Sequence, residues 1–169
     1  MKASTAAMDV FLNPGEFYFG DSDTRIRTIL GSCVAITVWH PQYRIGGMCH
    51  YMLPVRGRGR VVSLDGKYAD EAVLLLLKEI LRNRSNPYEY QVKLFGGGNM
   101  FAHIPSKSTH RHLSVADRNI VAGRKLLAQH GFSIAAEQLG GEGHRQIIFE
   151  VATGDVWVRK HDPVRAPAH

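Results

Sequence analysis

The apolar residues of the chain fall into several short runs and two longer stretches with helical spacing. Residues 33–39 read Cys-Val-Ala-Ile-Thr-Val-Trp, a β-branched and nearly continuous apolar segment typical of a strand buried on both faces. A turn at 40–43 separates it from residues 45–53, so the two segments predict a β-hairpin. Further strands are predicted at 16–19, 91–95, 132–138, 146–151 and 156–159.

Two segments predict helices by the spacing of their apolar residues. The first covers residues 67–82, with Asp65 as its predicted N-cap. The second opens at Ser114, where Asp117 follows at the spacing of a capping box, and it ends near Gly131. The order of strands, helix, strand, helix and strands indicates a mixed α/β or α+β domain.

Length and composition describe an ordinary globular protein. The 169 residues suit one domain, and we expect a flexible segment at 1–14, a folded domain at 15–160 and a loose tail at 161–169. The longest apolar stretch, 72–77, is far shorter than the roughly 20 residues that span a bilayer. The N-terminus also lacks the pattern of a secretory signal. We therefore expect a cytoplasmic protein with reduced thiols and no membrane insertion.

The formal net charge of +6 favours an acidic partner. Nucleic acid, an anionic membrane and an acidic protein surface all meet that description, and charge alone does not select among them. Three alternating arginines stand out in this respect, because they predict an exposed basic loop: Arg56, Arg58 and Arg60. No aromatic residues interleave with them, which argues against a site for single-stranded nucleic acid. The loop is either solvated or contacts an acidic protein.

The sharpest chemical feature is Cys33, which follows a Gly31-Ser32 pair. That pair predicts a tight bend directly before the buried strand. Backbone N–H groups in such a bend need not join the sheet, so they are candidates for an oxyanion hole, and Gly31 leaves space for a substrate. His50 lies seventeen residues later on the predicted partner strand. A cysteine beside a histidine is the minimal arrangement for thiol catalysis, and a paired imidazolium lowers the thiol pKa.

Thr28 is the local candidate to orient the imidazole of His50. Strand alternation places Cys49 and His50 on opposite faces, which predicts Cys33 as the nucleophile and Cys49 as a packing residue. Two alternatives remain open. In the first, Cys33 is only a small core residue, as cysteines in apolar strands commonly are. In the second, Cys33, Cys49 and His50 bind zinc. The fourth zinc ligand would then be His103, His110 or His112.

A glycine-rich loop follows the predicted strand at 91–95. Gly97, Gly98 and Asn99 belong to it, but no Gly-Lys-Ser/Thr follows, and the spacing of a nucleotide-binding loop is missing. We therefore predict that this loop lines the active site and contacts the substrate or its oxyanion.

Several of these segments together resemble the CheD family of chemoreceptor glutamine deamidases. They occur in the order expected of that family and extend from about residue 10 to about residue 160. The matching segments are 28–34, 46–54, 67–70, 93–100, 117–119 and 139–141. The segment 117–119 departs from the usual family form at its start, and 145–146 departs from a doubled basic pair.

The resemblance implies a single-domain layered sandwich with a mostly antiparallel sheet and two main helices, similar to toxin-type glutamine deamidases. It implies that Cys33, His50 and Thr28 form the catalytic site, without a metal or cofactor. The expected reaction converts receptor glutamines to glutamate through a thioester, and the same site allows hydrolysis of glutamate methyl esters.

The partners implied are methyl-accepting chemotaxis receptors, at whose membrane arrays the protein would be recruited, and a CheC-type phosphatase. One alternative is a non-catalytic docking protein for these partners. A second, suggested by charge alone, is a nucleic-acid-binding protein.

Overall fold

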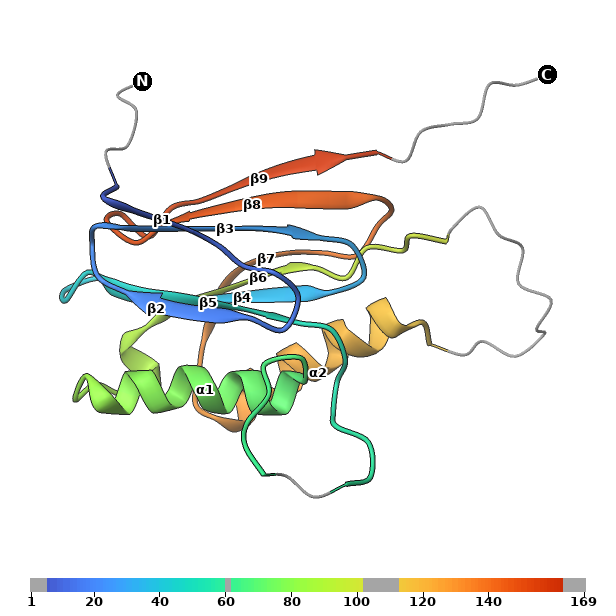
Figure 1. Cartoon of the computed structure of the whole chain (residues 1–169), viewed down its shortest axis with the longest axis horizontal. Helices are drawn as coiled ribbons and strands as arrows, with labels where there is room; N and C mark the ends of the chain where they lie inside the picture. The colour runs from blue at the N-terminus through green and yellow to red at the C-terminus, as the bar shows by residue number, and fades with distance from the viewer. Residues whose placement is uncertain (1–5, 60–61, 102–112, 163–169) are drawn as a thin grey trace.

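The computed structural model describes residues 6–59, 62–101 and 113–162. Within these ranges the chain forms two β-sheets and a layer of helices (Figure 1). The first sheet has the strand order β1 (Met8–Phe11), β3 (Thr24–Leu30), β8 (His144–Glu150), β9 (Val156–His161). The second has the order β2 (Phe17–Gly20), β5 (Ile45–Tyr51), β4 (Val34–His40), β6 (Gln91–Gly96), β7 (Ile134–Leu139).

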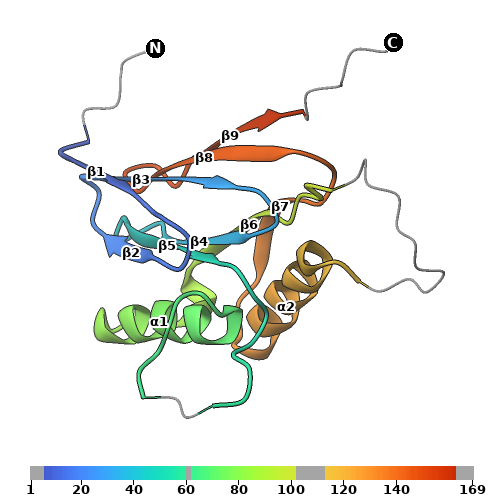
Figure 2. The same ribbon diagram turned by 45° about the vertical axis from the view of Figure 1, so that its right-hand side comes forward.

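The helices α1 (Ala69–Arg82) and α2 (Val115–Gln129) cover the face of the second sheet that points away from the first (Figures 1 and 2). A short 3-10 helix, η1 (Pro87–Glu89), precedes β6. Most strand pairs are antiparallel, and β1–β3 and β6–β7 are parallel. The mixed α+β class and the layered single-domain sandwich are therefore confirmed. No helix in the described ranges is long and apolar enough to cross a membrane.

Strand β4 lies at the centre of the molecule and is buried on both faces, as its apolar sequence predicts. Val34, Ile36 and Val38 pack with the helices in one core, whereas Ala35 packs in a second core between the sheets. The predicted hairpin is confirmed, because β4 and β5 are antiparallel with Ala35 opposite His50. Side chains of alternate residues on this hairpin therefore point into two different cores.

Two sequence predictions about these elements are wrong, and one strand has no counterpart among the predicted elements. The N-terminal segment expected to be flexible contains β1, and the following Leu12 is buried. Strand β3 was not predicted, although alternate residues of it are buried. Helix α1 begins at Ala69 with Tyr68 as N-cap, not at 67 after an Asp65 cap. Lys67 lies in a turn, and its carbonyl oxygen accepts from the amides of Met52 and Leu53. Tyr68 is extended and pairs with Leu53, so neither residue is helical.

Helix α2 begins as predicted. The Ser114 side chain accepts a hydrogen bond from the Asp117 amide, and the Asp117 side chain returns to the Ser114 amide. The last strand, β9, runs to His161, one residue into the predicted tail. Residues 163–169, Arg60 and the three candidate zinc-binding histidines at 103–112 lie outside the described ranges.

Candidate active site

Cys33 lies where the chain crosses from one sheet to the other. Strand β3 of the first sheet ends at Leu30, Gly31 and Ser32 form the predicted bend, and β4 of the second sheet begins at Val34. The half-buried side chain of Cys33 packs against the core between the sheets. The thiol is therefore at one end of the sandwich and partly open to solvent.

His50 faces the same space between the sheets. It sits opposite Ala35 on β4, and Cys33 precedes Ala35 by two residues, so the two side chains are diagonal neighbours on one face. Cα atoms of diagonal neighbours are roughly 7–8 Å apart, a separation that side chains can bridge. The hairpin thus places Cys33 and His50 on the same face of the second sheet. Cys49 points to the other face and is fully buried in the core beneath the helices.

Thr28 on β3 holds the imidazole from the opposite sheet. Its Oγ1 atom lies 2.7 Å from His50 Nδ1 and also donates to the carbonyl oxygen of Leu12 at 2.9 Å. Because a hydroxyl has only one hydrogen to donate, Thr28 Oγ1 accepts the hydrogen from Nδ1. That tautomer leaves Nε2 of His50 as an acceptor. Nε2 is buried and has no hydrogen-bond partner within the described ranges.

Burial controls protonation at this site. It lowers the pKa of His50 to about 4, against a smaller opposing effect of the Glu16 carboxylate. Burial also raises the pKa of the Cys33 thiol, partly offset by the amide N–H of Cys33 itself. At neutral pH the site therefore rests as a neutral thiol and a neutral imidazole. A resting imidazolium that lowers the thiol pKa, as the sequence suggested, does not fit this environment.

The glycine loop after β6 supports the bend that carries Cys33. The amides of Gly97 and Gly98 donate to the carbonyl oxygens of Cys33 and Gly31, both at 2.9 Å. They are therefore not free to bind an oxyanion, which corrects the sequence prediction for these two residues. The neighbouring Asn99 is exposed, and its amide donates to the carbonyl of Gly141 at 2.8 Å.

The remaining donors for an oxyanion are on the bend itself. Within the described ranges, the amides of Ser32 and Cys33 have no backbone acceptor. The Cys33 N–H lies near its own sulfur, since it lowers the pKa of that thiol. These two amides are therefore available to donate to an oxyanion, and their role as an oxyanion hole stays a prediction.

Sequence reasoning missed two buried polar residues around the site, Arg145 and Asn119. Arg145 on β8 donates to the carbonyl oxygens of Gly96, at 3.1 Å, and of Gly140, and it forms no ion pair within the described ranges. It thereby holds the glycine loop in place. The alternation of β8 could have revealed it, because Arg145 shares a face with buried Ile147.

The zinc alternative does not fit the geometry. Cys33 and His50 face the space between the sheets, whereas Cys49 faces the helices, so the three cannot bind one ion. Within the described ranges, no group of three or more His, Cys, Asp or Glu side chains is arranged to hold a metal.

The basic loop is only partly as predicted. Arg56 donates two hydrogen bonds to the Glu71 carboxylate, at 3.0 and 2.6 Å, and its guanidinium lies over the Tyr68 ring. This arginine is thus held against α1 rather than free to meet a partner. Arg58 is exposed.

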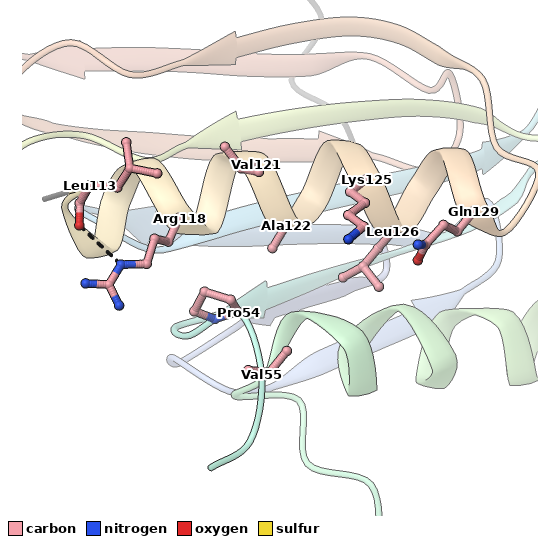
Figure 3. A pocket seen from close by; sticks show the side chains of 9 residues that line it. All are labelled: Pro54, Val55, Leu113, Arg118, Val121, Ala122, Lys125, Leu126 and Gln129. Carbon is pink, nitrogen blue, oxygen red and sulfur yellow. Dashed lines mark hydrogen bonds between the residues drawn. The ribbon is translucent and has the colours of Figure 1, made fainter.

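A separate apolar pocket of about 340 Å³ lies along α2 (Figure 3). Pro54 and Val55 form one wall, and Val121 and Leu126 belong to the helix on the other. The pocket contains none of the predicted catalytic side chains. Two of its lining residues, Pro54 and Val55, follow in the sequence shortly after β5, the strand that carries His50.

Comparison of the chain with known proteins identifies its family. A family model described as CheD chemotactic sensory transduction matches residues 52–160. The chain belongs to the CheD family. The CheD model begins two residues after His50, so it covers α1, α2 and the strands from β6 onward but neither Cys33 nor His50.

Individual CheD relatives match nearly the whole chain. A protein from Pseudomonas savastanoi pv. phaseolicola, named probable chemoreceptor glutamine deamidase CheD, is 51% identical over 98% of this chain and 92% of its own length. One from Dechloromonas aromatica, probable chemoreceptor glutamine deamidase CheD 3, is 49% identical over 89% and 86%. One from Leptospira interrogans, probable chemoreceptor glutamine deamidase CheD 1, is 40% identical over 90% and 93%.

Proposed function

We propose that this CheD-family chain is a chemoreceptor glutamine deamidase in which Cys33 is the nucleophile and His50 is the general base. The names of its relatives support the substrate and the reaction. The observation that carries the residue assignment is the 2.7 Å contact between Thr28 Oγ1 and His50 Nδ1. It orients Nε2, which is buried and has no hydrogen-bond partner among the described residues, on the sheet face that also carries the Cys33 thiol.

The first half of the reaction forms a thioester. Nε2 of His50 takes the thiol proton as the Cys33 sulfur attacks the side-chain amide carbon of a receptor glutamine. The amides of Ser32 and Cys33 stabilise the negative oxygen of the tetrahedral intermediate. The carbon–nitrogen bond then breaks, and the proton held by His50 goes to the leaving nitrogen, which departs as ammonia.

The second half restores the enzyme. His50 takes a proton from a water molecule as that water attacks the thioester carbon. The carbon–sulfur bond breaks, the proton returns to the Cys33 sulfur, and the receptor keeps a glutamate in place of glutamine. A glutamate methyl ester would react by the same steps with methanol as the leaving group.

The place of Cys33 suits a substrate presented by another protein. The thiol lies at the end of the sandwich, half-buried rather than at the bottom of a deep cavity. A glutamine side chain on a folded receptor can reach such a position without unfolding. Recruitment to receptor arrays and a CheC-type phosphatase partner remain predictions.

The reaction and the nucleophile can be tested together. Purified protein would be incubated with a receptor cytoplasmic fragment, and the peptides would be analysed by mass spectrometry for conversion of glutamine to glutamate. We expect conversion at specific glutamines, abolished in Cys33→Ala and His50→Ala and kept in Cys49→Ala. Cys49→Ala is the matched control, because it removes a thiol one residue from His50 that faces the other core.

Two results would contradict the proposal. Conversion that persists in Cys33→Ala would remove Cys33 from the chemistry. Stable receptor binding by the folded protein without any conversion would favour the non-catalytic docking alternative.

A further inference from the structure

Asn119 lies at the centre of the contacts between α2 and the site, although no step of the proposed reaction uses it. It is fully buried in the second turn of α2. A polar side chain with no exposed surface on a helix face that packs against a sheet needs a specific reason.

The Asn119 side chain joins the two segments that carry the catalytic pair. Its Nδ2 atom donates to the carbonyl oxygen of Ser32 at 3.2 Å and to that of Met52 at 2.8 Å. Ser32 directly precedes Cys33, and Met52 follows His50 by two residues. Both partners are acceptors, so the nitrogen of the amide must face them and its orientation is determined.

The other half of this amide has no partner. Oδ1 of Asn119 is buried and lacks a hydrogen bond within the described ranges. A buried acceptor without a partner is unfavourable for stability. The side chain is therefore poorly explained as a purely stabilising residue, and its two donated hydrogen bonds are the feature that needs a role.

Helix α2 is a rigid support for these bonds. The Tyr51 hydroxyl donates to the backbone carbonyl of Asn119 at 2.6 Å, and the capping box at Ser114 holds the start of the helix. Gly97 leaves space for the side chain of Ile120, the residue after Asn119, because a Cβ at position 97 would lie 2.5 Å from it. The helix, strand β5 and the glycine loop are therefore closely packed around Asn119.

The Ser32 carbonyl and the Cys33 N–H belong to one planar trans peptide group and point in opposite directions. A hydrogen bond that draws the Ser32 carbonyl toward α2 therefore turns the Cys33 N–H toward the side of the thiol. That N–H is one of the two candidate oxyanion donors, and its effect on the Cys33 pKa places it near the sulfur.

We propose that Asn119 is a positioning residue that orients the Ser32–Cys33 peptide as an oxyanion donor and ties it to the strand carrying His50. The inference rests on the proposed deamidase function. Asn119 does not touch the substrate; it acts through the Ser32 and Met52 carbonyls. Its loss should therefore impair stabilisation of the tetrahedral intermediate more than substrate binding or the reactivity of the thiol.

The test variant is Asn119→Leu, which has similar volume and removes both donated bonds without adding charge. We expect kcat for deamidation of a receptor fragment to fall about tenfold to a hundredfold, with KM within about twofold of wild type. Alkylation of Cys33 by iodoacetamide, which forms no oxyanion, should stay within about threefold. A general loosening of the site would change both rates together.

Ser85→Ala is the matched control, because Ser85 is a buried side chain that donates to a backbone carbonyl, Ile80 O, at 2.7 Å away from the site. It should lower the melting temperature and leave kcat within about twofold. Asn119→Ser keeps one donor and serves if the leucine variant does not fold; its kcat should be intermediate.

The outcomes separate this inference from the proposed function. A wild type without deamidase activity would overturn the proposed function. An active wild type with an equally active Asn119→Leu, or a parallel fall of deamidation and alkylation, would overturn the positioning role alone.

Discussion

His50 has one ring nitrogen held by Thr28 and the other buried without a partner within the described ranges. Its pKa is lowered to about 4, mainly by burial, whereas the pKa of the Cys33 thiol is raised. A neutral imidazole is the form that can accept a proton. The individual residues thus favour base-assisted attack from a neutral pair over attack by a preformed thiolate.

This protonation state predicts the acid limit of activity. His50 must be neutral to act as a base, and its lowered pKa keeps it neutral until the pH falls to about 4. We expect kcat/KM for deamidation to decline as pH falls through about 4, rather than through the ordinary histidine value of about 6.5. Measured pH profiles would show this, with circular dichroism at each pH to confirm that the protein is folded. A decline centred near the ordinary histidine pKa would instead indicate an exposed imidazole.

At the scale of elements, the site depends on a junction among the β3–β4 bend, the glycine loop after β6 and helix α2. Gly96 has a φ of 111°, in a region that favours glycine, and a Cβ there would clash with the Cys33 carbonyl oxygen. Arg145 and the amide of Gly97 hold the same loop. The position of Cys33 therefore depends on a loop more than sixty residues away in the sequence.

A glycine substitution can test this dependence. We expect Gly96→Ala to lower the free energy of unfolding by about 3 kcal/mol and to reduce deamidation strongly, because backbone strain and a clash at Cys33 act together. Urea unfolding and kinetics would measure the two effects. Gly131→Ala is the matched control: the φ of Gly131 is 79°, and no atom of the described residues lies within 4 Å of a Cβ at this position. This variant should lose only about 1 kcal/mol of stability and keep its activity. Similar effects of the two variants would show that Gly96 does not support Cys33.

At the scale of the whole molecule, the two sheets pack across one core and the helices cover another, and the chain carries a net charge of +6. Its arginines differ in what they can do. Arg56 pairs with the buried Glu71 side chain, whereas Arg58 is exposed. If the loop attracts an acidic receptor, we therefore expect the attraction to depend on Arg58 more than on Arg56.

Two single substitutions separate these roles. Arg58→Ala should raise the KM for a receptor fragment at low salt, with the effect shrinking as salt screens the charges, and should leave stability unchanged. Arg56→Ala should lower the free energy of unfolding, because it leaves the buried Glu71 without its partner. Kinetics at several salt concentrations and urea unfolding would measure both. An equal loss of turnover at all salt concentrations in Arg58→Ala would count against steering.

Local sequence determined much of this molecule. The continuous apolar segment at 33–39 predicted a strand buried on both faces, the 40–43 turn predicted its hairpin, and the Ser114 capping box predicted the start of α2. Alternation along β5 was enough to separate Cys49 from His50. These features depend on residues that are neighbours in the chain or on one strand pair, which is why sequence patterns reveal them.

Only the tertiary structure decided the rest. The predicted helix start after Asp65 is wrong because the backbone of residues 67 and 68 contacts that of residues 52 and 53. The amides of Gly97 and Gly98, predicted as oxyanion donors, instead donate to carbonyl oxygens of the bend that carries Cys33. The pKa of about 4 for His50 comes from burial between two sheets, and the role of Asn119 comes from two carbonyls that are 20 residues apart in the sequence. Desolvation and long-range hydrogen bonds depend on which surfaces meet, and no local pattern records that.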